Sequence, residues 1–325
     1  MMPNLTDTPN SLATSGTIAP QQTLCFPRGL PRRVGLKQRA LASLSSLLGA
    51  CFGPREAQAF GILMYHRIAN PPLGRPKPTW NVPPALFEQQ LRGLLARGWQ
   101  AWPLRQVLAC NERELPIPRK TFVVTFDDGY ANNLIHAAPI LTRLQVPATV
   151  FLATAYLDSQ RPFPSDDWSA AGLPGVPSDT WRPLTTEECR RLSASGLIEL
   201  GAHTHTHADF RGRADALADD LRQNLAILEA RFGVQQPMFA LPFGTKTDGF
   251  ADHELVQAAR AAGTTCCLTT EADLVRRGDQ PFDWGRFAAE DHDTAGTLAA
   301  KLGGWHTALR KLGDVAIHHR RNRRF

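Results

Sequence analysis

Adjacent carboxylates follow an apolar run in the middle of the sequence and are well placed to do chemistry. Asp127 and Asp128 come directly after the β-branched and aromatic run at 121–126 and just before Gly129. Such a run predicts a strand, and in parallel α/β folds active sites form at the carboxyl ends of strands. Two neighbouring carboxylates repel each other unless a positive group lies close, and a divalent cation is one such group. The alternative is that the pair caps the next helix, because aspartate is a good N-cap residue.

A second polar cluster is the histidine-rich run at 203–207, which follows a predicted strand at 197–202. Neutral imidazole nitrogens bind Zn²⁺ and similar ions, and His203 and His207 are spaced so that one turn of chain can present both on one side. An ordinary polar loop is the alternative reading of this run taken alone. Combined with a carboxylate at another strand end, two histidines leave coordination positions open for water and substrate, as in catalytic metal sites.

The third motif runs from Phe239 to Gly244 and ends a strand at a proline, an aromatic residue and a glycine. Alone it predicts only a strand and a turn, although such a turn could also aim backbone N–H groups at an oxyanion. The three motifs in this order resemble the polysaccharide deacetylase family, also called the NodB homology family or carbohydrate esterase family four. The Thr-Phe-Asp-Asp-Gly, His-Thr-x-x-His and Phe-x-x-Pro-Phe-Gly blocks each match, and the resemblance covers about 119–319.

The resemblance implies a role for each matched residue. Asp127 takes the place of the catalytic base that activates water, and the backbone N–H of Phe243 takes the place of the oxyanion donor. Asp128, His203 and His207 take the places of the metal ligands. Zn²⁺ is the expected ion, and Co²⁺, Ni²⁺, Mn²⁺ and Fe²⁺ are the alternatives.

The sequence departs from the family pattern at Ala240, where many members carry an arginine that orients the catalytic aspartate. Without that arginine, the support of Asp127 must come from another part of the chain. Arg286, which follows Asp283 and Trp284, is the candidate for a replacement guanidinium.

A candidate general acid lies near the start of the apolar region, in the Leu-Met-Tyr-His-Arg-Ile block at 63–68. This block resembles the opening of an exopolysaccharide-type subgroup, in which the first strand replaces the usual last one. The resemblance implies that His66 protonates the leaving amine, a task that suits an imidazole because its pKa lies near working pH. His318 near the end of the chain is the alternative acid, and a packed histidine at a strand end is the alternative role for His66.

Tryptophan residues are the candidates for substrate contact, since their faces supply apolar contact area to sugar rings. Trp168 lies in a long loop at 158–183, which we expect to form a wall of the sugar groove. The alternative is that Trp168 only fastens this loop to the core. Trp284 is a candidate for lining the pocket of the acetyl methyl group.

Short apolar runs alternate with amphipathic helical patterns from about residue 60 onwards, which predicts a parallel sheet. We expect an α/β fold, a distorted (β/α) barrel of about seven parallel strands, with the site at the carboxyl ends of the strands. The predicted strands are at 60–65, 99–102, 121–126, 148–152, 197–202, 238–242, 264–269 and 315–317. The predicted helices are at 84–97, 132–144, about 217–232, 250–262 and 296–312.

The ends of the chain differ in composition from its body, and three parts are expected. Residues 1–58 form a disordered segment plus a short amphipathic helix, 59–319 a single deacetylase domain, and 320–325 a basic tail. The net charge of +6 comes from the ends, because 1–58 and 318–325 each carry +4. The body is therefore slightly acidic, which argues against a nucleic-acid partner.

The sequence contains no run of about 18 apolar residues, so no transmembrane helix is expected. The stretch at 36–51 resembles a weak export signal, because Leu48-Gly49-Ala50 precedes Cys51. Location is left open between the cytoplasm and a peripheral association with the cell envelope. None of the six cysteines forms a Cys-x-x-Cys pair, which excludes a cysteine zinc site of that kind.

Together the motifs predict a metal-dependent N-deacetylase that acts on an N-acetylated polysaccharide or oligosaccharide. One alternative is a non-sugar amidase or esterase built on the same scaffold. Another is a catalytically impaired relative that binds carbohydrate, which the missing arginine at Ala240 leaves open.

Overall fold

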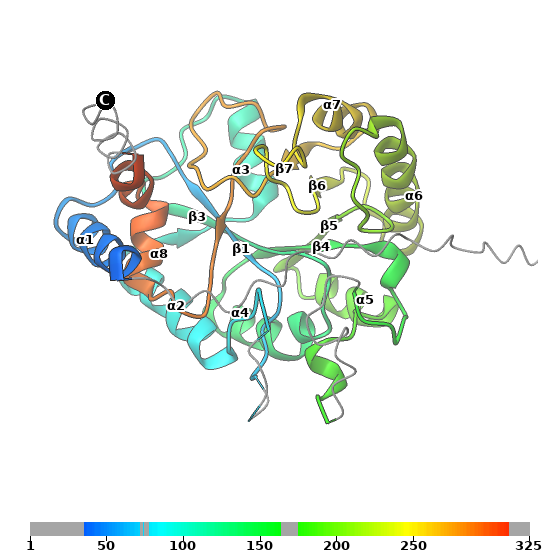
Figure 1. The fold of residues 1–325 in the computed structure, drawn as a ribbon, viewed down its shortest axis with the longest axis horizontal. Coiled ribbons are helices and arrows are strands. Elements are labelled where there is room, and N and C mark those ends of the chain that lie inside the picture. The colour runs from blue at the N-terminus through cyan, green and yellow to red at the C-terminus, as the bar shows by residue number, and fades with distance from the viewer. Residues whose placement is uncertain (1–35, 72–73, 75–77, 164–174, 312–325) are drawn as a thin grey trace, which may run out of the picture. The chain divides into compact units, whose positions relative to one another are not determined.

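A computed structural model of the chain describes residues 36–71, 74, 78–163 and 175–311 (Figure 1). All of them belong to one compact unit, Pro31–Phe325, whereas a second unit, Met1–Leu30, lies wholly outside the described residues. Several sequence predictions also fall outside them: the disorder expected before residue 36, Trp168, the strand at 315–317, His318 and the tail at 320–325.

The centre of the unit is a sheet of parallel strands in the order β7-β6-β5-β4-β3-β1-β8, with the short β2 also paired to β3. This arrangement confirms the predicted distorted (β/α) barrel. The strands read as continuous apolar runs because both faces of the sheet are buried. The strands are β1 (Gly61–Tyr65), β2 (Gln100–Ala101), β3 (Thr121–Phe126), β4 (Ala148–Leu152), β5 (Ile198–Ala202), β6 (Met238–Ala240), β7 (Cys266–Leu268) and β8 (Phe287–Ala288).

Helices connect the strands and cover the outside of the sheet (Figure 1). They are α1 (Leu36–Phe52), α2 (Pro84–Ala96), α3 (Leu104–Glu112), α4 (Ala138–Leu144), α5 (Thr186–Ala194), α6 (Ala214–Phe232), α7 (His253–Ala261) and α8 (Ala295–Leu302), with the π-helix η1 (Asn133–Ala137) and the 3₁₀ turns η2 (Thr154–Tyr156) and η3 (Ser178–Thr180). Sequence periodicity did not predict α3, α5 or β8. The helix predicted at 132–144 is divided into η1 and α4, and the one predicted at 296–312 is interrupted after α8 by a turn at Gly303 and Gly304.

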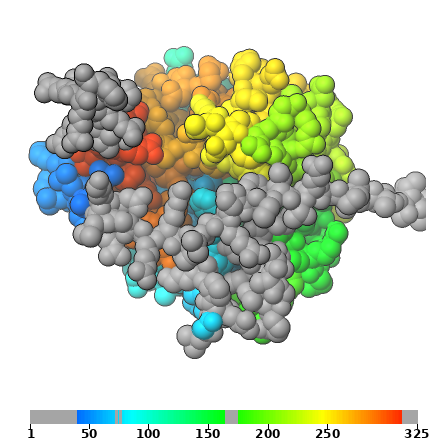
Figure 2. All heavy atoms as spheres, viewed as in Figure 1, coloured from blue at the N-terminus to red at the C-terminus, as the bar shows by residue number. Residues whose placement is uncertain are grey.

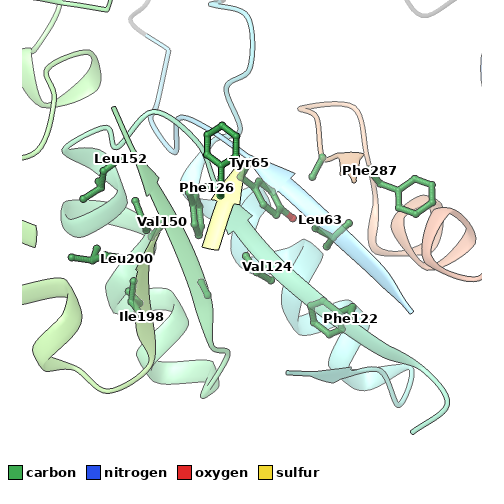
Figure 3. Close-up of a cluster of buried hydrophobic side chains, with 14 of the residues drawn as sticks. Leu63, Tyr65, Phe122, Val124, Phe126, Val150, Leu152, Ile198, Leu200 and Phe287 are labelled. Atoms are coloured by element: carbon green, nitrogen blue, oxygen red, sulfur yellow. The ribbon is translucent and has the colours of Figure 1, made fainter. Parts of the chain in front are cut away.

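The two faces of the sheet pack into different clusters, because successive strand residues point to opposite sides. Figure 3 shows the larger, outer cluster, in which Val124 and Phe126 of β3 lie between Leu63 of β1 and Val150 of β4. The residues of the opposite face fill the inside of the barrel: Phe60, Ile62, Val123, Phe151, Met238, Ala240, Cys266, Leu268 and Trp284 are among them. Val123 of β3 belongs to this inner cluster, and the alternation of side chains along the strand places Asp127, four residues later, on the same face.

The segment at 284–288 links the two ends of the sheet. Trp284 forms a parallel bridge to Leu268 at the end of β7, and Phe287 pairs with Leu63 of β1. This short segment therefore closes the sheet, and Arg286 lies between its two attachments.

The N-terminal helix α1 packs against α8, as the blue and orange elements show in Figure 1. Trp305 Nε1 donates to the carbonyl of Gly53, 2.7 Å away, and the Arg55 N–H donates to Gly303. In the space-filling view, α1 and the residues after α8 form adjoining blue and red surfaces (Figure 2). Among the described residues, no helix combines the length and the apolar character that a membrane crossing requires.

Candidate active site

A buried ion pair lies at the carboxyl end of β3. The Arg286 guanidinium donates to both carboxylate oxygens of Asp127, at 2.6 and 2.8 Å, and neither side chain is more than 3% exposed. Arg286 also donates to the carbonyl of Thr269 and to Oγ1 of Thr125, which fixes the plane of the guanidinium. Burial alone would raise the pKa of Asp127, but the charge and hydrogen bonds of Arg286, together with the nearby imidazoles of His203 and His66, hold that pKa below its ordinary value.

A second carboxylate, that of Asp128, faces the two histidines of the His-Thr-x-x-His motif. Its Oδ1 lies 3.4 Å from Nε2 of His203 and 3.2 Å from Nε2 of His207, and all three side chains are buried. The Nδ1 of His203 lies 2.8 Å from the carbonyl of Ala240. Because a carbonyl only accepts hydrogen bonds, Nδ1 carries a proton, and in the neutral form of His203 the lone pair of Nε2 faces Asp128.

The chemistry of these three side chains fits a metal ion. Oδ1 of Asp128 is buried and has no hydrogen-bond partner among the described residues. When both imidazoles are neutral with their Nε2 lone pairs directed at Asp128, one carboxylate oxygen and two nitrogens lie close together as a set of donor atoms that a cation would bind. Two nitrogens and one oxygen also match the donor set of catalytic zinc sites.

Several backbones at the site adopt a conformation that favours glycine. Asp128, Thr204, His207 and Phe243 have φ values between 54° and 72°, although none of them is glycine. Each such residue costs roughly 1–3 kcal/mol, and the surrounding structure must therefore hold it in place. Four of the nine non-glycine residues with positive φ in the described part of the chain therefore lie in the three loops that carry the motifs.

Helix α6 holds the histidine loop through two side chains one turn apart. The carboxylate of Asp220 accepts hydrogen bonds from the backbone N–H groups of His205 and Thr206 and from the Thr206 hydroxyl. The Asn224 amide donates to the carbonyls of Leu152 and Thr204. Sequence reasoning missed both residues, because on a helix they look like ordinary polar positions.

His66 follows β1 and lies close to Asp127. Its Nε2 is 4.0 Å from Oδ2 of that carboxylate. Burial lowers the pKa of His66, against the opposing pull of the Asp128 and Asp127 charges. The Asn133 amide, on the π-helix η1, donates to the His66 carbonyl at 2.9 Å. The imidazole also stacks on Trp80, with ring centroids 5.2 Å apart. No sequence motif marked Asn133 or Trp80 as part of the site.

The Pro-Phe-Gly turn brings Phe243 to the histidine loop. Its ring meets that of His207 edge to face at 5.0 Å, and the Gly244 N–H donates to the carbonyl of Pro242 at 2.7 Å. The ring of Phe243 therefore contacts one of the three candidate metal ligands.

Trp284 lies inside the barrel. Its side chain is 1% exposed, its ring packs edge to face against Phe60 at 5.4 Å, and it belongs to the inner cluster. Its role in lining a pocket for the acetyl methyl group stays a prediction.

Comparison with known proteins gives consistent results. The model of the polysaccharide deacetylase family matches residues 115–267. The putative polysaccharide deacetylase YxkH of Bacillus subtilis is 23% identical over 217 residues, which are 66% of this chain and 66% of that protein. The poly-beta-1,6-N-acetyl-D-glucosamine N-deacetylase of Escherichia coli K12 is 29% identical over 118 residues, or 36% of this chain and 17% of that enzyme. The matches thus span only part of these curated relatives.

Solved structures share the fold. IcaB from Ammonifex degensii superposes with a TM-score of 0.63 at 23% identity, covering 76% of this chain and 98% of that one. The deacetylase PplD of Streptococcus pyogenes, solved in complex with acetate, superposes with a TM-score of 0.61 at 18% identity, covering 76% and 99%. At these identities the likeness concerns the fold alone.

Proposed function

Because the chain belongs to the polysaccharide deacetylase family, we propose that it is a metal-dependent N-deacetylase of an N-acetylated polysaccharide or oligosaccharide. The observation that carries this proposal is the geometry at the end of β3. Asp127 is held by Arg286, and the next residue, Asp128, meets His203 and His207. The Asp127 carboxylate is thus paired with Arg286, whereas the Asp128 carboxylate is available to bind a cation.

Asp128, His203 and His207 would hold the metal ion, with Zn²⁺ as the first candidate. When bound, the ion supplies Lewis acidity toward an acetyl carbonyl and toward water. The remaining groups of the site are residues of this chain.

Asp127 acts as the general base in this proposal. Its pKa below the ordinary value keeps the carboxylate ionised near neutral pH, so that it can accept a proton from the attacking water. Arg286 engages both carboxylate oxygens and therefore fixes the direction of the remaining lone pairs.

His66 acts as the general acid and donates a proton to the amide nitrogen as it leaves. The backbone N–H at Phe243 stabilises the oxyanion that develops on the acetyl oxygen. In the balanced reaction water adds to the acetyl carbon, the carbon–nitrogen bond breaks, and the products are acetate and a free amine on the sugar.

The test is release of acetate from N-acetylglucosamine oligomers, with Zn²⁺ and with a chelator. We expect the wild-type protein to release acetate in a chelator-sensitive way. Asp127→Asn should release none, and Asp219→Asn, which changes an exposed carboxylate on α6, should behave like wild type. Release only from simple amides or esters would favour the non-sugar alternative, and binding of oligomers without release would favour a carbohydrate-binding relative.

A further inference from the structure

Trp80 presents a large apolar surface to solvent beside the proposed general acid. One side of its indole stacks on His66, with an angle of 29° between the rings, yet the residue is 52% exposed. Among the described residues it is one of few large hydrophobic side chains with that much open surface, and the other exposed ones lie on different elements.

The backbone around Trp80 is held in place on both sides. The Trp80 carbonyl accepts a hydrogen bond from the Arg67 N–H at 3.1 Å, and the Arg67 carbonyl accepts from Val82 at 3.0 Å. Next to it, the buried Asn81 side chain exchanges hydrogen bonds with the backbone N–H and carbonyl of Ala69. Hydrogen bonds therefore hold residues 80–82 against residues 67–69, which follow β1, and this fixes the position of the indole.

The backbone of Trp80 has an unfavourable conformation, and the partial burial of the side chain does not compensate for that cost. Its φ is 54°, a value that favours glycine or asparagine and is rare for bulky residues. A tryptophan in a strained position usually gains stability from being buried, whereas this one leaves half of its surface in water. Stability alone would favour a smaller residue here, so the exposed indole points to a ligand.

We propose that Trp80 forms a subsite that stacks a sugar ring of the glycan next to the unit being deacetylated; this proposal rests on the proposed function. The flat face of a pyranose presents C–H groups and packs on an indole in the way that other amphipathic rings do. His66 occupies the near side of the indole, so a ring stacked on Trp80 lies beyond His66 and belongs to a neighbouring unit of the chain. Trp80 therefore contributes to the binding of oligosaccharides and not to the binding of a single N-acetylated sugar.

The test compares substrates of different length in the metal-loaded protein. Acetate release is measured on N-acetylglucosamine monomer, dimer and pentamer for wild type, Trp80→Ala and Trp80→Phe, and binding of the same sugars is measured by calorimetry. In Trp80→Ala we expect KM and Kd for the pentamer to rise about tenfold, comparable to the loss of one aromatic contact. The monomer should be unaffected, and Trp80→Phe should restore most of the pentamer affinity. Phe52→Ala, which removes an exposed ring on α1, serves as the control and should match wild type.

The outcomes separate this proposal from the proposed function. If wild type binds the pentamer through Trp80 but releases no acetate, the subsite stands and the deacetylase activity fails. Equal KM and Kd in wild type and Trp80→Ala at every length would overturn the subsite while leaving the activity intact. A fall in kcat that is the same for all lengths, with unchanged KM, would also overturn it, because the indole would then act only on His66. Failure of wild type to bind any of these sugars would overturn both.

Discussion

Arg286 donates to both oxygens of Asp127 although 159 positions separate the two residues in the sequence. The arginine comes from the short segment that closes the sheet between β7 and β1. Ala240, at the position where many family members place the supporting arginine, is buried inside the barrel and offers its carbonyl to His203. The guanidinium thus reaches the aspartate from a different segment of the chain, the one just before β8.

Replacing Arg286 tests this support. Arg286→Lys should slow acetate release by about a hundredfold, because a lysine cannot engage both carboxylate oxygens and the base loses its orientation. Arg286→Met should lower the free energy of unfolding by about 3–5 kcal/mol, since it leaves the Asp127 charge buried without a partner. The measurements are steady-state rates and urea unfolding. A wild-type rate in Arg286→Met would show that Asp127 needs no partner.

Metal addition should stabilise the folded protein at one defined site. Zn²⁺ at 100 times its Kd should raise the free energy of unfolding by about 2.7 kcal/mol, because the ion binds only the folded state. His203→Ala should abolish this effect. His292→Ala, in a second cluster with Glu290 and Asp293, is the control and should retain it. Loss of the effect in the control variant alone would place the ion at that second cluster.

The support of the histidine loop by α6 should be visible in metal affinity. Asp220→Asn weakens the hydrogen bonds to His205 and Thr206, so we expect Zn²⁺ affinity to fall roughly 10–100-fold, as for other residues that orient metal ligands. Asp219→Asn, one position earlier and exposed, should leave the affinity unchanged. Competition with a chromophoric chelator measures both. Equal affinities in the two variants would remove Asp220 from the metal site.

The proposed acid can be separated from the base by the choice of leaving group. His66→Gln should lower kcat for N-acetylated sugars by about 10²–10⁴, since the departing nitrogen needs a proton. An aryl acetate, whose leaving group departs as an anion, should be affected much less. His136→Gln, on the π-helix η1, is the control. Equal losses on both substrates would contradict an acid role for His66.

The ion pair between Arg182 and Glu188, which lies near the loop after Asp128, should make the free energy of unfolding depend on pH. Arg182 donates to both oxygens of Glu188 at 2.8 and 2.7 Å, and the carbonyl of Arg182 and the N–H of Leu184 bond to the Ala131 and Gly129 backbones. Burial opposes ionisation of Glu188, but Arg182 and the hydrogen bonds with Thr185 together more than compensate, and the net pKa is lowered.

Since the folded-state pKa of Glu188 is depressed, its contribution to stability is complete above the unfolded value and is lost as the pH falls through the folded value. Glu188→Gln keeps a side chain able to complete the helix cap and removes the charge. We expect it to cost about 1 kcal/mol at pH 7 and close to nothing well below pH 4. Unfolding curves across this pH range measure the difference, and a constant difference would assign the effect to the cap.

The strands and the order of the motifs were predictable from the sequence. The runs at β3 and β4 are buried on both faces, so nearly continuous apolar sequence identified them. Strands that run parallel bring their carboxyl ends to one edge, which is why Asp128 and His203 could be expected to meet. Helices α3 and α5, each with two buried residues in nine, were missed, although α7, with the same number, was predicted.

The sequence by itself determined which residues have the chemistry to bind a metal and to move protons, because motif spacing is a local property of the chain. Only the tertiary structure decided which partners they have. The two-residue strand β8 has too little sequence to show a period of two, yet its position brings Arg286 to Asp127 and turns Trp284 into the barrel interior. The stack of Trp80 on His66 and the hold of Asp220 on the histidine loop also depend on packing between segments distant in the chain. These contacts depend on how the sheet closes, and local sequence patterns do not predict that closure.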